Sequence, residues 1–268
     1  MKCEKAVAIS IDTRFFGKQI AWMNSITQSI IHDEGDFLLI DKPFDWTSFD
    51  VVAKIRNTFK GVGLKRKVGH SGTLDPKATG LLILATGRKT KEISSLEVLD
   101  KVYDGAFKLG VMTESHDIET SEYGHCSVEH LTQGEIRALA SEFEGTHQQQ
   151  PPMHSAAWHN GKRLYAHARK GEVIKERKTK EIVIHRFEVT RVELPMVYFV
   201  LHVSKGAYIR VIAHEFGAAL GVGGYLASLR RLSIGSYQLS SSQSVTETIE
   251  AIVRQATTAS EGVKGDKG

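Results

Sequence analysis

The stretch KVGHSGTLDPKATGLLIL, residues 67–84, decides how this chain folds. It places one carboxylate, Asp75, in a loop between a short basic strand and the apolar run that begins at Leu81. Glycines at three positions relax the limits on this backbone, and Pro76 fixes its own φ and lacks an N–H donor. An acid on a loop of such fixed shape is typical of a reactive group on a rigid platform. An Asp-Pro pair among glycines is also typical of a plain turn, and the local residues leave both interpretations open.

The residues around this loop predict short strands and capped helices. Upstream, FLLID (37–41) predicts an apolar strand that ends at the turn Lys42-Pro43. Thr47 or Ser48 then caps a helix whose apolar residues recur at helical spacing. Downstream, LLILATG (81–87) is typical of a strand that is buried on both faces of a sheet.

The second half of the chain continues this mixture. Thr132 and Glu135 have the spacing of a capping box, which marks the start of a helix. Because strands and helices do not alternate as regular βαβ units, the sequence predicts an α+β layer fold. The further elements expected are strands at 103–111, 182–192 and 196–203, and helices at 132–145, 208–220 and 244–253.

Size and composition limit the classes of protein to consider. With 268 residues and 41% hydrophobic residues, the chain can bury a large core as one domain, or as one domain with a small appendage. Its two cysteines lack C-x-x-C spacing, so the sequence predicts neither a disulfide framework nor a cysteine zinc site. The chain shows no signal peptide and no apolar run of membrane-spanning length, and we therefore expect a cytoplasmic protein.

Positive charge is concentrated immediately upstream of Asp75. The net charge of +4 is modest, but residues 51–74 hold six basic side chains and no acidic one. Such a run is often only the solvated face of a helix. Here it leads directly into the candidate site, and it indicates a substrate that carries phosphates. The six residues are Lys54, Arg56, Lys60, Lys65, Arg66 and Lys67.

Six ordered sequence blocks resemble the bacterial tRNA pseudouridine-55 synthases of the TruB type, over about residues 36–237. The blocks are DKPFDWTS (41–48), GHSGTLDPKATGLL (69–82), KVYDGAFKLG (101–110), QPPMHSA (150–156), SKGAYIR (204–210) and LRR (229–231). The resemblance implies the pseudouridine synthase fold. That fold is a mixed sheet with a central catalytic cleft, flanked by helices and by an RNA-binding insertion.

The resemblance also assigns three catalytic residues. Asp75 matches the catalytic carboxylate, which either attacks C1′ of the ribose or assists elimination of uracil, and the sequence leaves both routes open. Arg210 matches the arginine that pairs with this carboxylate, and its guanidinium is expected to orient the acid and keep it deprotonated. Tyr103 matches a tyrosine that packs against the target base and serves in proton transfer.

Further residues are expected to contact RNA. The target base lies inside a folded loop, so it must be turned out into the pocket, and His70 matches the residue that fills the vacated stack. Tyr208 and Leu229 match positions that line the pocket. Lys42 belongs to a family motif whose role looks structural, and we include it among the RNA-contacting candidates. Positive charge for RNA binding is expected from Lys67, Arg163 and Lys170.

The expected organisation has three parts. Residues 1–33 match no family block and form a leader of unknown role, and residues 34–240 form the catalytic domain. Within that domain, the polar and charged segment at about 146–182 predicts an exposed insertion that grips RNA. Residues 241–268 form a C-terminal helix and tail, too short for the family's usual RNA-binding PUA domain. His154 and Trp158 depart from the family pattern and leave the packing of the pocket there unassigned.

The leading hypothesis is isomerisation of uridine 55 to pseudouridine in the T loop of tRNA. Such an enzyme needs no redox change, and we predict no cofactor, no metal, no protein partner and a monomer that binds the T arm of tRNA. Three alternatives stay open. They are the catalytic subunit of a guide-RNA pseudouridylation particle, a noncatalytic tRNA-binding or RNA-folding protein, and a glycosylase that would release free uracil.

Overall fold

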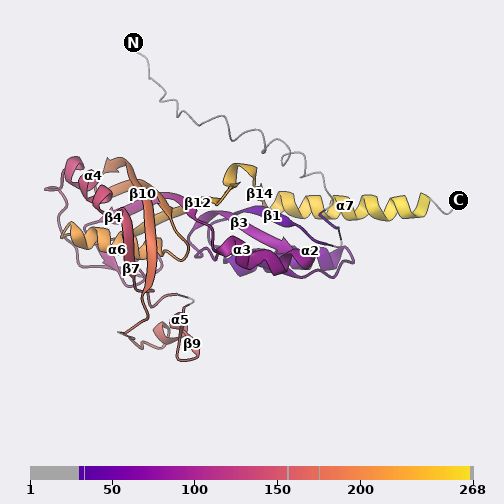
Figure 1. The fold of residues 1–268 in the computed structure, drawn as a ribbon, viewed down its shortest axis with the longest axis horizontal. Coiled ribbons are helices and arrows are strands. Elements are labelled where there is room, and N and C mark those ends of the chain that lie inside the picture. Colours follow the sequence, from indigo (N-terminus) through magenta and orange to yellow (C-terminus); the bar gives the residue numbers. More distant parts are fainter. Residues whose placement is uncertain (1–29, 33, 156, 175, 266–268) are drawn as a thin grey trace, which may run out of the picture.

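The computed structural model describes residues 30–32, 34–155, 157–174 and 176–265. In this part of the chain a long mixed sheet is flanked by helices, and the predicted α+β class is confirmed (Figure 1). The main path of the sheet has the order β14-β1-β3-β12-β4-β11-β10-β7, and β2 and β13 pair beside β3 and β12. None of the helices in the described residues is both long and apolar enough to cross a membrane.

The first half of the chain supplies one end of the sheet and the helices that cover it. Its elements are β1 (Phe37–Lys42), α2 (Ser48–Gly61), β2 (Val68–Ser71), β3 (Thr79–Thr86), η3 (Gly87–Glu92), α3 (Ile93–Glu97), β4 (Lys101–Leu109), β5 (Met112–Thr113), β6 (Glu122–Tyr123) and α4 (Gln133–Glu142). The strand at β4 begins and ends two residues before the strand expected at 103–111.

The second half completes the sheet and returns to its first strand. Its elements are β7 (Gly145–Gln149), β8 (Trp158–His159), β9 (Lys162–Arg163), α5 (Leu164–Ala168), β10 (Lys180–Glu193), β11 (Met196–Val203), α6 (Ile209–Ala219), β12 (Gly224–Ile234), β13 (Tyr237–Gln238), η4 (Leu239–Ser241), β14 (Gln243–Ser244) and α7 (Val245–Gly265). The C-terminal helix therefore continues well beyond the predicted end at Val253.

Strand β12 joins the two ends of the sheet. It pairs in parallel with β3, where Arg231 lies opposite Gly80, and antiparallel with β4, where Arg231 lies opposite Tyr103. The loop that carries Asp75 ends at β3, so this loop, β4 and β12 meet at one place. The junction lies near the middle of the molecule's long axis (Figure 1).

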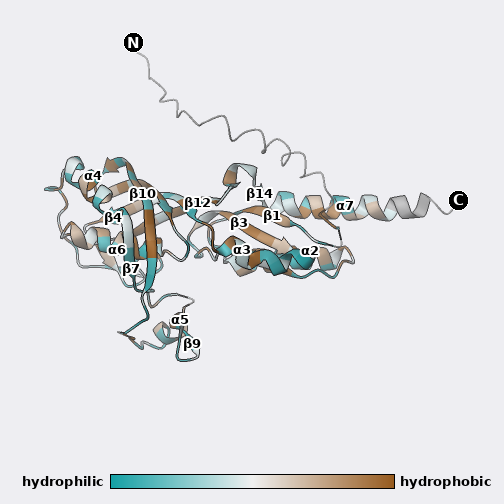
Figure 2. Ribbon diagram, viewed as in Figure 1, coloured by the Kyte–Doolittle hydropathy of each residue, from teal (hydrophilic) through white to brown (hydrophobic). Residues whose placement is uncertain are grey.

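Strand β3 is buried on both faces, as its apolar run predicted. Leu82 and Leu84 pack into a cluster with residues of α2 and α7, whereas Leu81 and Ile83 pack into a cluster on the opposite face that includes Leu96 of α3. Figure 2 shows the apolar colour of β3 between these layers and the polar outer face of α2. The burial of successive residues on alternate faces fixes the register of this strand in the sheet.

An aromatic core lies under the other end of the sheet. Phe107 of β4 contacts Phe187, Phe199 and Phe216, with ring centroids 4.3–5.9 Å apart. Helices α4 and α6 pack against this cluster, and Ile136 and Phe216 are fully buried there. Because α6 begins at Ile209, this packing also fixes the position of Arg210 in its first turn.

Local capping signals proved accurate. Thr47 and Asp50 form a complete capping box at α2, and Thr132 and Glu135 form another at α4. Ser244 and Glu247 exchange the same pair of contacts at the start of α7. These side chains satisfy backbone N–H groups that the first turn of a helix leaves without a partner.

The structure refines two of the expected boundaries. The excursion from the sheet covers 150–179 rather than about 146–182, because 145–149 form β7 and β10 begins at Lys180. The C-terminal segment is part of the domain, since β14 pairs with β1 and Ile252 of α7 is buried in the core beside α2. Residues 1–29 and 33 of the expected leader lie outside the described residues, whereas Ile30 packs against that core.

Candidate active site

The backbone on either side of Asp75 is fastened to two different elements. Before it, the Ser48 hydroxyl of α2 accepts a hydrogen bond from the N–H of Leu74 at 2.9 Å and donates to the Leu74 carbonyl at 3.1 Å. After it, the Pro76 carbonyl accepts hydrogen bonds from Lys42 Nζ at 3.2 Å and from the N–H of Asp45 at 3.0 Å. The loop therefore holds its acid on supports built from β1 and α2.

A third support comes from Arg231 of β12. Its guanidinium is buried, and it donates to the carbonyls of Gly72 and Leu81 at 2.9 and 2.7 Å. Gly72 has φ of 70°, in the left-handed region that favours glycine, and a Cβ there would lie 3.3 Å from Arg231 Nη1. A glycine and a buried arginine together define the path of the chain into the site.

Arg210 forms an ion pair with Asp75 through the Nε and Nη2 edge of its guanidinium. The Nε atom lies 2.8 Å from Asp75 Oδ2, and Nη2 donates to Oδ1 at 3.4 Å. The Arg210 side chain is only 5% exposed, while that of Asp75 keeps 39% of its surface accessible. This arrangement orients the carboxylate and leaves part of it facing the cavity.

The remaining contacts of Arg210 bring in residues that the sequence did not single out. Arg210 donates to the carbonyls of Ser115 at 3.0 Å and His154 at 2.9 Å, and its Nε lies 3.5 Å from Asp117 Oδ2. Only the backbone of His154 takes part, so the departure from the family pattern at that position leaves this bond intact. Asp117 was missed, and a short polar run after the strand that ends at Leu109 was the only signal for it.

Burial and a second acid raise the pKa of Asp75. Loss of hydration is the largest cause, and the charge of Asp117 acts in the same direction. The Arg210 guanidinium opposes both, through its charge and its hydrogen bond, but the pKa of Asp75 still lies above the ordinary value of 3.8. The arginine therefore limits the rise in the pKa of Asp75 and does not depress it, in contrast to the simplest expectation for such a pair.

Five of the predicted residues meet at one cavity of about 610 Å³. Asp75 and Arg210 lie on its wall, and the other three are Tyr103 on β4, Tyr208 before α6 and Leu229 on β12. Its volume lies in the range of small-molecule and nucleotide pockets, and its wall combines apolar side chains with several charged ones. These five come from four separate parts of the chain, and no local pattern brings them together.

The tyrosines are fixed in different ways. Tyr103 is largely buried and belongs to the aromatic core, where it pairs across the sheet with Leu201. The backbone of Tyr208 exchanges two hydrogen bonds with the side chain of Gln149, at 2.7 and 3.1 Å. Burial raises the pKa of the Tyr208 phenol, so this ring is expected to be neutral unless a proton is transferred.

Lys42 corrects one sequence prediction. Its side chain is completely buried, and its ammonium donates to the carbonyls of Pro43, Trp46 and Pro76. Burial lowers the pKa of Lys42 to about 8, and Asp75 partly opposes this effect. Lys42 cannot reach RNA from this position, and it supports the turn beneath Asp75, as its motif suggested.

Four of the RNA-contacting candidates lie outside the cavity wall, namely His70, Lys67, Arg163 and Lys170. His70 is half-buried on β2, and burial lowers the pKa of its ring. Its Nδ1 atom is buried without a hydrogen-bond partner in the described part of the chain. Lys67 and Lys170 are exposed, and Arg163 lies over the Trp158 ring at 4.3 Å from its centroid.

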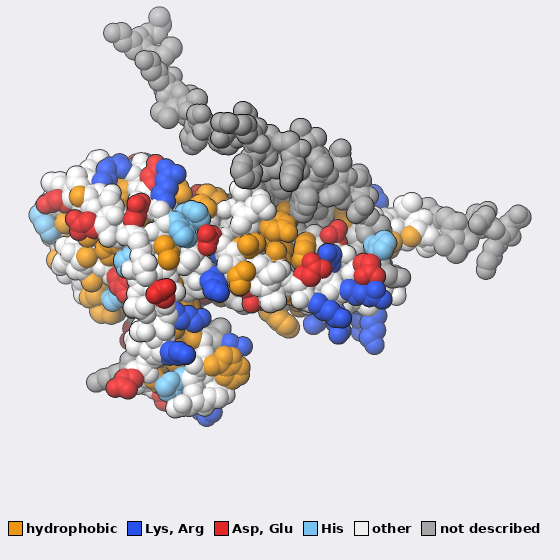
Figure 3. All heavy atoms as spheres, viewed as in Figure 1, with side chains coloured by type: hydrophobic (Ala, Val, Ile, Leu, Met, Phe, Trp, Pro, Cys, Tyr) orange, Lys and Arg blue, Asp and Glu red, His pale blue; other side chains and the backbone are white. Residues whose placement is uncertain are grey.

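The predicted basic run forms a surface over α2 and the loop after it. We call this set, defined by its residues, the α2 basic surface. Figure 3 shows the Lys and Arg side chains gathered there on one face of the molecule. The surface consists of the exposed residues Lys54, Arg56, Lys60, Lys65 and Lys67.

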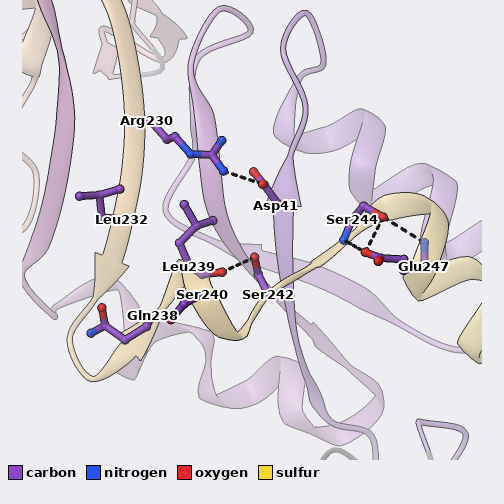
Figure 4. Close-up of a pocket in the computed structure, with 9 residues that line it drawn as sticks. All are labelled: Asp41, Arg230, Leu232, Gln238, Leu239, Ser240, Ser242, Ser244 and Glu247. Carbon is purple, nitrogen blue, oxygen red and sulfur yellow. Dashed lines mark hydrogen bonds and ion pairs between the residues drawn. The ribbon is translucent and has the colours of Figure 1, made fainter.

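A second cavity of about 610 Å³ lies between β12, η4 and the start of α7 (Figure 4). Its charged groups already have partners, since Arg230 Nη2 pairs with Asp41 at 2.6 Å and Glu247 caps α7 through Ser244. It contains none of the predicted catalytic residues. The cavity at Asp75 is the better candidate because its carboxylate is both oriented and partly open.

Comparison with known proteins points to one family. Residues 60–209 match the TruB family pseudouridylate synthase, N-terminal domain. The chain is 70% identical over 222 residues to a tRNA pseudouridine synthase B of Chlorobium chlorochromatii, covering 83% of this chain and 87% of the relative. It is 63% identical over 228 residues to the enzyme of the same name in Chlorobaculum tepidum, covering 85% and 95% of the two chains.

Solved structures show the same fold. A chain of an H/ACA RNP bound to a substrate RNA containing 2′-deoxyuridine matches with a TM-score of 0.60 and 25% identity, over 82% of this chain. A chain of a Cbf5-Nop10-Gar1 complex matches with a TM-score of 0.62 and 26% identity, over 82% of this chain. The protein spans 54% and 58% of the length of those two chains.

Proposed function

The chain belongs to the TruB family of pseudouridylate synthases, and from this premise we propose that it isomerises uridine 55 in the T loop of tRNA with Asp75 as the catalytic group. The tRNA substrate follows from relatives that are 63–70% identical and are tRNA pseudouridine synthase B. One observation carries the role of Asp75. Its carboxylate is held side-on by Arg210 at 2.8 Å and lines the cavity that Tyr103 and Leu229 also line.

The residues of this cavity suit the chemistry of the reaction. The bond between uracil N1 and ribose C1′ breaks, the base turns, and a bond forms between C5 and C1′. C5 then loses a proton and N1 gains one, so the product is an isomer of the substrate. An ionised Asp75 can bond to C1′ or assist elimination, while Arg210 keeps its oxygens oriented. Tyr103 offers the base a flat face and, through its phenol, a group that can relay the C5 proton.

RNA is held outside the cavity by charge and stacking. The α2 basic surface is proposed to contact the phosphates. Lysines and arginines that neutralise phosphates release the counterions condensed on the RNA, and this release favours binding. In the excursion at 150–179, Trp158 is exposed and Arg163 lies over its ring, which supports the predicted contact with RNA there. His70 remains our candidate for filling the stack after the base leaves.

The test uses purified protein and an unmodified tRNA transcript, with no guide RNA and no other protein. We expect pseudouridine at position 55 and no free uracil. Free uracil would identify a glycosylase. Binding without any product, even after a guide RNA is added, would identify a noncatalytic tRNA-binding protein, and either result would refute the proposal.

A guide-RNA-dependent subunit is the second candidate, favoured only by the fold shared with the Cbf5 and H/ACA structures. It would modify nothing in the guide-free assay and would act after addition of a guide RNA. We propose instead a monomer that acts alone in the cytoplasm on the T arm of tRNA. Size-exclusion chromatography of the active protein with light scattering tests the monomer.

A further inference from the structure

Three side chains of types that can ligate a metal, Asp100, His185 and His202, lie together away from the Asp75 cavity. Asp100 Oδ2 lies 3.4 Å from His185 Nε2 and 3.8 Å from His202 Nε2, and the two imidazole centroids are 4.7 Å apart. One ligand atom from each of the three lies within 4.8 Å of the others. In the described part of the chain, the ion pairs of Asp100 involve these two histidines and no lysine or arginine.

A β-bulge aims His185 at this cluster. In the pairing of β10 with β11, Ile184 lies opposite Val203 and Arg186 lies opposite His202, so His185 is the extra residue. Ile184 is buried while His185 is exposed, and Arg186 is exposed as well, so two successive residues point away from the core. A regular strand would send one of them inward, and bulges commonly re-aim a side chain in this way.

The separations fit a tetrahedral zinc ion. With bonds of 2.0–2.1 Å to nitrogen and oxygen, neighbouring ligand atoms of a tetrahedral site lie about 3.3 Å apart. The two Asp100 contacts are close to this spacing, and the histidine rings are exposed enough to adjust by small rotations. Two imidazoles and one carboxylate suit a zinc ion far better than magnesium, which prefers six oxygen ligands.

We infer that Asp100, His185 and His202 form a binding site for one Zn²⁺ ion, with solvent as the fourth ligand. A cavity of about 520 Å³ borders Asp100 and His202 and leaves room for that ligand. His202 pairs with Val102, which also lines this cavity, whereas Tyr103 pairs with Leu201 on the other face of the sheet. The zinc site is therefore separate from the Asp75 cavity, and it connects β10, β11 and the start of β4.

Isothermal titration of ZnCl₂ into tag-free, metal-stripped protein tests this inference. The wild-type chain is expected to bind one equivalent with micromolar or tighter affinity, unaffected by excess Mg²⁺. In the double variant H185Q/H202Q the affinity should fall by about 100-fold or more, because even the outer partners of metal ligands are worth about 10–100-fold. Co²⁺ in the wild-type protein should give the visible absorption of a tetrahedral ion.

The matched control is His130→Gln, an exposed histidine elsewhere on the surface, which should bind zinc like the wild type. Circular dichroism and metal-free pseudouridine formation check that the double variant is folded, since neither histidine lines the Asp75 cavity. Equal zinc affinity of the double variant and the wild type would overturn the inference. So would the absence of saturable zinc binding by the wild-type protein below about 100 µM, whatever the outcome of the tRNA assay.

Discussion

At the residue scale, the site depends on the balance of charge around Arg210. One buried guanidinium faces two carboxylates, Asp75 at 2.8 Å and Asp117 at 3.5 Å. Two acids that share one cation repel each other, so the second acid works against ionisation of the first. Asp117 accordingly helps to position Arg210 while it raises the pKa of Asp75.

This balance predicts how the reaction responds to pH. If Asp75 must be ionised, activity should rise as pH increases through its raised pKa, so the acid limb should lie above 3.8, the ordinary value. Asp117→Asn removes a repelling charge, which lowers the pKa of Asp75 and should move this limb to lower pH. The measurement is the second-order rate constant for pseudouridine formation between about pH 4 and 8, which reports the free enzyme.

The comparison of wild type and Asp117→Asn uses the pH at which the acid limb of the rate profile lies. It does not use the value of the rate constant at the plateau of that profile. The variant is expected to have a lower plateau as well, because Arg210 loses one of its partners. A limb that stays in place, or moves to higher pH, would contradict the assignment of Asp75 as the titrating group.

The sequence singled out the proposed catalytic residues but not the residues that support them. Asp75, Tyr103 and Arg210 could be assigned because each lies in a block that resembles the family. Asp117 lies in no such block, and its role follows from a contact with Arg210, 93 positions along the chain, that folding alone creates. Lys42 was placed in contact with RNA because local sequence does not show that its ammonium turns inward to three carbonyls.

At the element scale, the cap of α2 is linked to the catalytic loop. Thr47 caps this helix, and the next residue, Ser48, holds both backbone groups of Leu74. Fraying of the first turn would therefore release the residue directly before Asp75. The capping box of α4, built on Thr132, has no such connection to the loop.

Thr47→Ala and Thr132→Ala should separate these two effects. Each variant loses one capping box and should be destabilised by about 1 kcal/mol in urea unfolding. Only Thr47→Ala should also lower kcat several-fold, because the position of Asp75 depends on Ser48. An equal effect of the two variants on kcat would show that the cap of α2 matters for stability alone.

The turn at Gly72 allows a second test at this scale. Gly72→Ala places a Cβ at a left-handed φ of 70° and 3.3 Å from Arg231 Nη1, so the free energy of unfolding should fall by about 1–2 kcal/mol. Gly61→Ala is the control, because its Cβ meets nothing within 4 Å at the end of α2. Urea denaturation measures both, and comparable stability of the two variants would contradict the role given to Gly72.

Elements were predictable where the signal was local. The capping boxes and the apolar run of β3 lie within a few residues of each other, and these elements formed as expected. Residues 146–149 were assigned to an exposed insertion because their polar composition hides their pairing with β10. The bulge at His185 was also missed. The sequence shows a histidine within a predicted strand, but it does not show which residues of β11 lie opposite that strand.

At the scale of the whole molecule, one continuous sheet connects the helix that carries the basic surface with the strands that line the Asp75 cavity. The α2 basic surface precedes the Asp75 loop in the chain, and β12 connects this end of the sheet to β4 and Tyr103. The C-terminal helix packs into the hydrophobic cluster beneath α2, so α7 belongs to the same folded unit. The sequence placed the boundary at residue 240 because the pairing of β14 with β1 joins distant segments.

The α2 basic surface predicts a strong salt dependence of tRNA affinity. Neutralising two of its residues, with K54Q/K60Q, should weaken binding and reduce the slope of log K against log [salt] by about 1 for each phosphate that the protein no longer neutralises. The measurement is tRNA affinity between about 50 and 200 mM salt. The control is Arg186→Gln on β10, whose guanidinium pairs with Glu188 at 2.7 Å, and it should leave the slope unchanged. Affinity that does not vary with salt would remove this surface from the account.

The most direct test is single-turnover pseudouridine formation by Asp75→Asn, with tRNA affinity measured on the same protein. The amide keeps the shape of the side chain but cannot be a nucleophile or base, so we predict no detectable product and an affinity within about tenfold of wild type, or about 1.4 kcal/mol. Asp41→Asn, in the second cavity (Figure 4), is the control that should stay active. Normal turnover by Asp75→Asn would contradict the central claim.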